Sequence, residues 1–132
     1  PPSNSQERTL RMLNCLAVGT GGFLGSVLRY GISQLPLGTQ AGFPWKTFFI
    51  NLAGCFLIGV ITALALRRPA PDPRLVLFWK VGVCGGFTTF SSFALETGSL
   101  LQSGSAPAAL AYAVLSLVLG VLAVFAGQML FR

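Results

Sequence analysis

Charged side chains are scarce in this sequence, and histidine is missing. Of the 132 residues, 9 are Lys or Arg, 3 are Asp or Glu, and none is His. Apolar residues make up 53% of the chain, so the few charges cannot cover the surface of a water-soluble domain. The composition therefore excludes an ordinary soluble domain and favours a protein whose surroundings are lipid.

The side chains needed for metal sites and for catalysis are also few. The three cysteines, Cys15, Cys55 and Cys84, lie in three different apolar segments, and no Cys-x-x-Cys pair occurs. Without histidine or paired cysteines, the sequence predicts no transition-metal site, no disulfide framework and no nucleophile–base pair of an enzyme. We interpret the thiols as small apolar groups.

Basic residues give the chain a net charge of +6. They occur singly or in pairs beside apolar runs, as Arg67 and Arg68 do, and this placement is typical of side chains that flank a membrane. We therefore expect no nucleic-acid partner.

Long apolar runs are abundant. Four of them reach the ~20 residues that a helix needs to cross a bilayer. They cover about Leu10–Ile32, Thr47–Leu66, Leu75–Leu101 and Ala108–Phe131. We expect an all-α membrane protein in which residues 1–132 form a single four-helix transmembrane domain. The first run is too long and too glycine-rich for a signal peptide, and only PPSNSQE, residues 1–7, is expected to be a disordered tail.

Small residues recur at a spacing of four, which allows helix backbones to approach closely in lipid. The pairs are Gly21 and Gly25, Cys55 and Gly59, and Ala123 and Gly127. Four helices enclose little space between them, so an oligomer is the easier way to build a polar pathway.

Polar residues inside apolar runs need a reason, because lipid does not solvate them. Thr47 and Asn51 are one helical turn apart and share a face of the second run. Asn51 either forms an interhelical hydrogen bond or offers its uncharged amide donors to a permeating anion.

The stretch GGFTTFSSF, residues 85–93, interrupts the third run. Ser and Thr can kink a helix, but two adjacent glycines favour a true break. A break frees backbone carbonyls that need a partner. No carboxylate lies in the stretch, so a monovalent cation fits these oxygens better than a divalent one.

Phe90 and Phe93 are three residues apart and share a helix face. They are either a packing pair or rings whose positive edges line an anion path. Arg29 and Glu96, near the ends of the first and third runs, are interpreted as side chains that extend to the membrane surface, and Arg29 also as a cation at a pore mouth.

Three motifs, in this order, resemble the small bacterial fluoride channels of the Fluc, or CrcB, family. They are GGFLGSVLRY at 21–30, FPWKTFFINLAGCFLIG at 43–59 and GVCGGFTTFSSFALE at 82–96. The resemblance covers all four runs. It implies a four-helix subunit with a broken third helix, an antiparallel dual-topology dimer in the inner (plasma) membrane, and two pores at the subunit interface. Passive efflux of cytoplasmic fluoride through these pores would confer fluoride resistance.

The resemblance also implies roles for individual residues. The carbonyls of Gly85 and Thr88 would bind a structural Na⁺ on the dimer axis, and Arg29 would lie in the pore vestibule. The fluoride pore would be lined by Asn51, Phe90, Phe93, Thr47, Tyr112 and Ser116. Ala94 and Gly120 stand where family members often carry a hydroxyl.

Two other functions are compatible with a tiny four-helix protein. A proton-coupled exporter of the small multidrug kind needs an ionisable carboxylate at mid-membrane in its first helix, and this first run has none. A structural membrane subunit would explain the small-residue spacing but not the polar residues.

The basic residues are distributed unevenly between the two sides expected for four spans. The side of the termini collects Arg8, Arg11, Arg67, Arg68, Arg74 and Arg132, whereas the other has Arg29 and Lys46. Such a bias puts the termini in the cytoplasm, yet a dual-topology dimer normally goes with little bias. The partner is therefore either a second copy, which we favour, or an oppositely oriented paralogue in a heterodimer.

Overall fold

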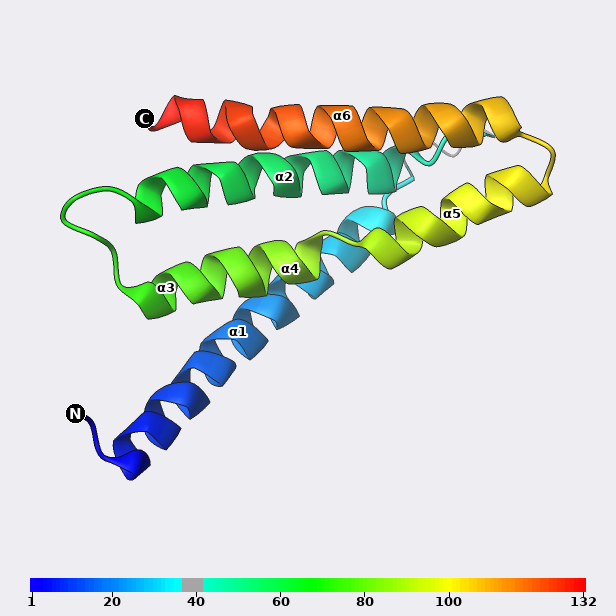
Figure 1. Cartoon of the computed structure of the whole chain (residues 1–132). Coiled ribbons are helices and arrows are strands. Elements are labelled where there is room, and N and C mark those ends of the chain that lie inside the picture. Colours follow the sequence, from blue (N-terminus) through cyan, green and yellow to red (C-terminus); the bar gives the residue numbers. More distant parts are fainter. Residues whose placement is uncertain (37–41) are drawn as a thin grey trace.

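The computed structural model describes residues 1–36 and 42–132, and their secondary structure is helical throughout (Figure 1). Four helical rods are long and apolar enough to cross a membrane, which confirms the expected all-helical architecture. Three rods are the single helices α1 (Asn4–Ser33), α2 (Trp45–Ala65) and α6 (Ala106–Leu130). The remaining rod is segmented into α3 (Pro73–Leu77), the π-helical η1 (Phe78–Val83), α4 (Cys84–Phe87) and α5 (Phe90–Gln102).

Helix α1 begins earlier than the apolar run predicts. Ser3 Oγ accepts a hydrogen bond from the Gln6 N–H, and the Gln6 side chain accepts one from the Ser3 N–H. This reciprocal capping box satisfies two backbone donors at the helix start. The expectation of a disordered tail over residues 1–7 is therefore wrong from Asn4 onward.

The third rod is broken at Thr88 and Thr89, which have extended backbone angles between α4 and α5. The break lies just after the glycine pair rather than at it, because Gly85 and Gly86 remain helical. Gly86 instead allows a close approach, since a Cβ there would collide with the backbone of Gly22 in α1. Thr89 then caps α5 by accepting a hydrogen bond from the Ser92 N–H.

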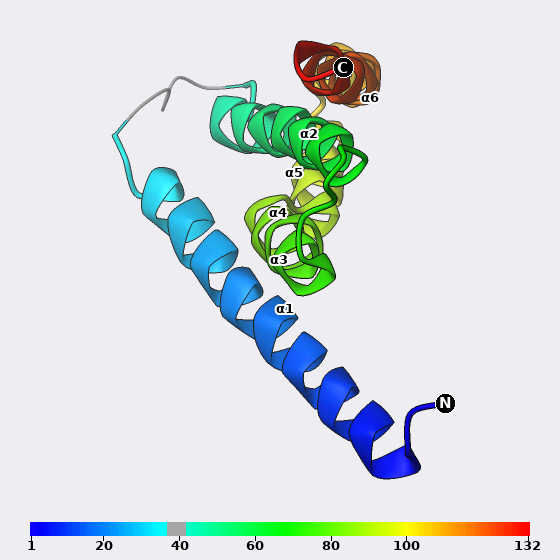
Figure 2. The same cartoon turned by 90° about the vertical axis from the view of Figure 1, so that its left-hand side faces the viewer.

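Helix pairs meet at glycines. Helix α2 runs beside α6, and α1 crosses η1 and α4 at a steep angle (Figures 1 and 2). A Cβ at Gly59 or Gly127 would collide with the backbone of the facing helix in the first pair, and one at Gly21 or Gly25 would do so in the second. The spacing of small residues thus serves close packing within the chain.

Both termini and the connection from α2 to α3 lie toward one end of the molecule (Figure 1). Side chains link these ends: Arg67 donates to the Phe131 carbonyl and lies over the Phe131 ring, and Arg74 donates to the Asn14 side chain. The basic residues near the termini therefore gather at this end.

Candidate functional site

The break in the third rod is held by Asn51 of α2. Its Nδ2 donates to the Thr89 carbonyl at 3.1 Å, and the Thr89 N–H donates to its Oδ1 at 2.8 Å. The amide thus satisfies both backbone groups of Thr89, as a neighbouring peptide would in regular structure. The interhelical interpretation of Asn51 is confirmed, and the second Nδ2 hydrogen has no acceptor within residues 1–36 and 42–132.

The same contacts determine which carbonyls the break frees. In a continuous helix the N–H groups of Thr89 and Ser92 would donate to the carbonyls of Gly85 and Thr88. Here they donate instead to Asn51 Oδ1 and Thr89 Oγ1. The carbonyls of Gly85 and Thr88, the two that the resemblance assigns to sodium, are therefore among those that lose their helical donors at the break.

The chemistry of these oxygens fits a monovalent cation. They are neutral backbone oxygens, and the nearby Gly86 carbonyl is occupied by Arg29 Nε at 3.1 Å. A Cβ placed on Gly85 would have no atom within 4 Å in the described chain, so this side of α4 faces open space. The position is accessible to an ion and to further ligands from outside the chain.

A groove of 560 Å³ lies between α2, η1, α4, α5 and α6, and η1 contributes Lys80 and Val81 to its lining. Six of the predicted site residues line it: Asn51, Gly85, Thr88, Phe90, Phe93 and Ser116. Within the described chain, the Ser116 Oγ is buried and has no hydrogen-bond partner. A buried hydroxyl without a partner is unfavourable by about 1–3 kcal/mol, so a ligand or water in the groove would stabilise it.

The two predicted rings differ in their packing. The Phe93 ring meets the Tyr112 ring edge-on, with centroids 5.0 Å apart. Phe90 lies 5.7 Å from Phe93 and is 79% exposed. Phe93 is therefore anchored to α6, while Phe90 projects from the surface of the single chain.

Thr47 and Tyr112 do not line the groove; both donate to Glu96. The Thr47 hydroxyl reaches Glu96 Oε1 at 2.6 Å, and the Tyr112 hydroxyl reaches Oε2 at 2.7 Å. Tyr112 is fully buried. The expectation that Glu96 extends to the membrane surface is wrong, because two hydroxyls from α2 and α6 hold its carboxylate inside the bundle. The sequence did contain a signal for this direction, because Glu96 follows Phe93 by three residues and therefore shares its helix face.

Arg29 likewise turns inward rather than toward the membrane surface. Its Nε donates to the Gly86 carbonyl at the end of α4, and the side chain is half-buried. The break provides an acceptor that a continuous helix would not offer, and this acceptor draws the guanidinium to it. Arg29 does not line the groove.

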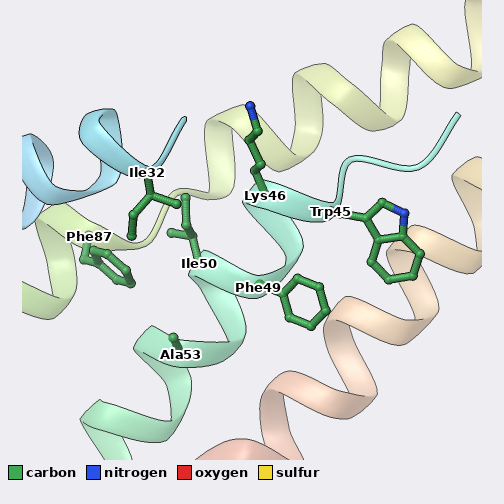
Figure 3. Close-up of a pocket in the computed structure, with 7 residues that line it drawn as sticks. All are labelled: Ile32, Trp45, Lys46, Phe49, Ile50, Ala53 and Phe87. Carbon is green, nitrogen blue, oxygen red and sulfur yellow. The ribbon is translucent and has the colours of Figure 1, made fainter. Parts of the chain in front are cut away.

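A second cavity, of 520 Å³, lies between α1, α2 and α4 (Figure 3). Its lining is Ile32, Trp45, Lys46, Phe49, Ile50, Ala53 and Phe87. The Lys46 ammonium points away from the apolar side chains and donates to the Ser33 carbonyl at 3.0 Å. Because its lysine donates to a backbone carbonyl and most of its lining is apolar, the 560 Å³ groove is the better candidate site.

Comparison with known families gives one match across most of the chain. Residues 16–128 match the model described as CrcB-like protein, Camphor Resistance (CrcB).

Curated relatives agree with this match. A fluoride-specific ion channel FluC from Thermus thermophilus is 51% identical over 116 residues, which are 87% of this chain and 92% of the relative. The channel of the same name from Rhizobium meliloti is 46% identical over 123 residues, covering 92% and 98% of the two chains. A third, from Chlorobium phaeobacteroides, is 46% identical over 112 residues, covering 85% and 87%.

Proposed function

The chain belongs to the CrcB-like family, and we propose that it is a fluoride-specific ion channel that lets cytoplasmic fluoride leave the cell passively. It is a multi-pass membrane protein and not an enzyme, and we place it in the inner (plasma) membrane, where efflux would confer fluoride resistance. The observation that carries the proposal is the buried Ser116 hydroxyl, which has no partner among the described residues and shares one groove with Asn51 and the Phe90–Phe93 pair.

The groove suits a small anion because neutral donors replace water along it, with Lys80 as an exposed cation in the lining. Moving a bare ion into an apolar medium is unfavourable by on the order of 20 kcal/mol in an idealised estimate. The Ser116 hydroxyl, the second Nδ2 hydrogen of Asn51 and the positive edges of the rings would offset this. Neutral groups bind an anion weakly enough to release it, which favours conduction.

The hydroxyls of Thr47 and Tyr112 would serve as further donors along the same anion path. Their protons are directed at Glu96, so they are available to an anion only when Glu96 gives up one of these hydrogen bonds. We therefore place them beside Ser116 as donors that Glu96 holds in orientation. Arg29, whose side chain is cationic and half-buried, would attract anions to the vestibule.

We propose that the working unit is an antiparallel dimer of this single-domain chain. Phe90 is largely exposed, and Gly85 faces open space at the break. A second copy crossing there would cover the ring and contribute its own Gly85 and Thr88 carbonyls. A structural Na⁺ on the dimer axis would neutralise the four carbonyl dipoles that the two breaks bring together.

Selectivity tests the proposed function. Liposomes that contain the purified protein are expected to release fluoride at least ~100-fold faster than chloride, which is a weaker hydrogen-bond acceptor, an advantage of about 2.7 kcal/mol. A fluoride-selective and a chloride-selective electrode measure the two rates, with empty liposomes as the control. Equal chloride efflux would contradict a fluoride channel, and strict dependence on a proton gradient would indicate an exporter.

Orientation distinguishes the homodimer from a heterodimer. We propose the homodimer, because one chain carries every residue that two symmetric pores would need. A cysteine tag at the C-terminus, on a variant whose other cysteines are alanine, is then expected to react with an impermeant reagent in about half the copies in intact cells. Complete protection would indicate that all copies have cytoplasmic termini, as the basic residues favour, and that an oppositely oriented partner is missing.

A further inference from the structure

Two of the three cysteines line the groove described above, although they lie far apart in the sequence. Cys55 comes from α2 and Cys84 is the first residue of α4, and both contribute to the groove wall together with Asn51 and Ser116. The two segments pack directly against each other here, because Asn51 bonds to Thr89 and a Cβ on Gly54 would collide with the Thr88 side chain. Both thiols are free.

A small space lies beside the Cys55 sulfur. Its Sγ lies opposite Gly120 of α6, where an added Cβ would be 3.5 Å away, in ordinary van der Waals contact. The glycine therefore leaves the space of a methyl group beside the sulfur. Cys84 is 3% exposed, and the groove is its opening to the outside.

We propose that Cys55 and Cys84 together bind a soft, thiol-seeking divalent metal ion of the Hg²⁺ class, and that the bound ion blocks the anion path. This proposal rests on the proposed channel function. Thiolates are the protein ligands that such soft ions prefer. On binding, each S–H bond breaks, two sulfur–metal bonds form and two protons leave to water, with no change in oxidation state.

The charge balance favours this site over other cation sites in the groove. Two thiolates neutralise a divalent ion completely, so the complex avoids the large penalty for an unpaired charge in an apolar region. The complex would occupy the groove beside Asn51 and Ser116, and Cys84 directly precedes Gly85, whose carbonyl loses its helical donor at the break. A bound ion therefore obstructs the donors.

Cys15 provides a matched control, because it is exposed on α1 and does not line the groove. Proteoliposomes are first tested for fluoride efflux and then treated with Hg²⁺. We expect efflux to fall at least ~10-fold, to recover with excess 2-mercaptoethanol, and to resist Hg²⁺ in Cys55→Ala and Cys84→Ala but not in Cys15→Ala. Loss of the block in Cys15→Ala, or efflux unaffected by bound Hg²⁺, would overturn the inhibitory site.

A binding measurement separates this proposal from the channel function. Mass spectrometry of the purified wild-type protein is expected to show one tightly bound Hg²⁺ that consumes two thiols, with Cys15 still free to react. Cys55→Ala is expected to lose this bridging ion, even if Cys84→Ala does not fold. If the untreated protein shows no fluoride efflux but still binds one Hg²⁺ through two thiols, the channel function is rejected and the metal site stands. If the wild-type protein binds two Hg²⁺ ions independently, the shared metal site is rejected.

Discussion

Replacement of Asn51 by alanine is expected to reduce fluoride efflux at least ~10-fold and to lower the thermal stability of the protein. The variant leaves the Thr89 N–H and carbonyl without the partners that they have at 2.8 and 3.1 Å. Each unpaired buried group is unfavourable by about 1–3 kcal/mol. The free energy of unfolding therefore falls, and the break that exposes the Gly85 and Thr88 carbonyls loses the side chain that holds it open. Efflux from proteoliposomes and a melting curve measure the two effects.

Two further variants separate the roles of Asn51. Thr62→Ala removes a polar group from the same helix that bonds only to the Ile58 carbonyl, and it is expected to leave efflux unchanged. Asn51→Asp retains an oxygen acceptor for the Thr89 N–H but has no amide donor for an anion. If Asn51→Asp recovers stability without efflux, the donor role is supported. Normal efflux in Asn51→Ala would contradict both the capping and the donor role in conduction.

The four membrane-crossing rods could be predicted from the sequence because each contains a long, nearly uncharged apolar run. Their ends could not, since they depend on local capping: Ser3 with Gln6 extends α1 toward the N-terminus, and Asp72 starts α3 through the Arg74 N–H. The glycine pair correctly indicated a break in the third rod. Its position at Thr88 and Thr89 depends on Asn51, which is 38 residues away in the chain. The packing of α2 against the third rod determines which backbone groups form hydrogen bonds with the Asn51 side chain.

The groove residues were predicted from three different signals. Asn51 is a polar residue in an apolar run, Phe90 and Phe93 share a helix face, and Ser116 was indicated by the resemblance; the structure places all four around one space. Glu96 was misinterpreted because its position near the end of an apolar run indicates depth but not direction. Its direction is set by hydroxyls on two other helices, which a one-dimensional pattern cannot bring together.

Replacement of Phe90 by isoleucine is expected to reduce fluoride efflux at least ~10-fold while the subunit folds normally. The ring is 79% exposed in the single chain, and its one ring contact there, 5.7 Å between centroids, is with Phe93. Isoleucine keeps much of the bulk and apolar character of the side chain but has no positive ring edge to face an anion. Because so little of the ring is buried within the chain, its replacement is expected to change the stability of the subunit only slightly. Efflux, melting temperature and the mass of the assembly are measured together.

Phe93 and Phe125 complete this test. Phe93→Ile is expected to reduce both efflux and stability, because it also removes the edge-on contact with Tyr112, a type of contact that contributes about 0.5–1.5 kcal/mol. Phe125→Ile changes an exposed ring on α6 outside the groove and is expected to affect neither. A Phe90→Ile protein that conducts normally would show that the ring does not contact the ion. One that loses efflux only because it no longer assembles would assign Phe90 to the subunit interface, and normal assembly with lost efflux assigns it to the pore.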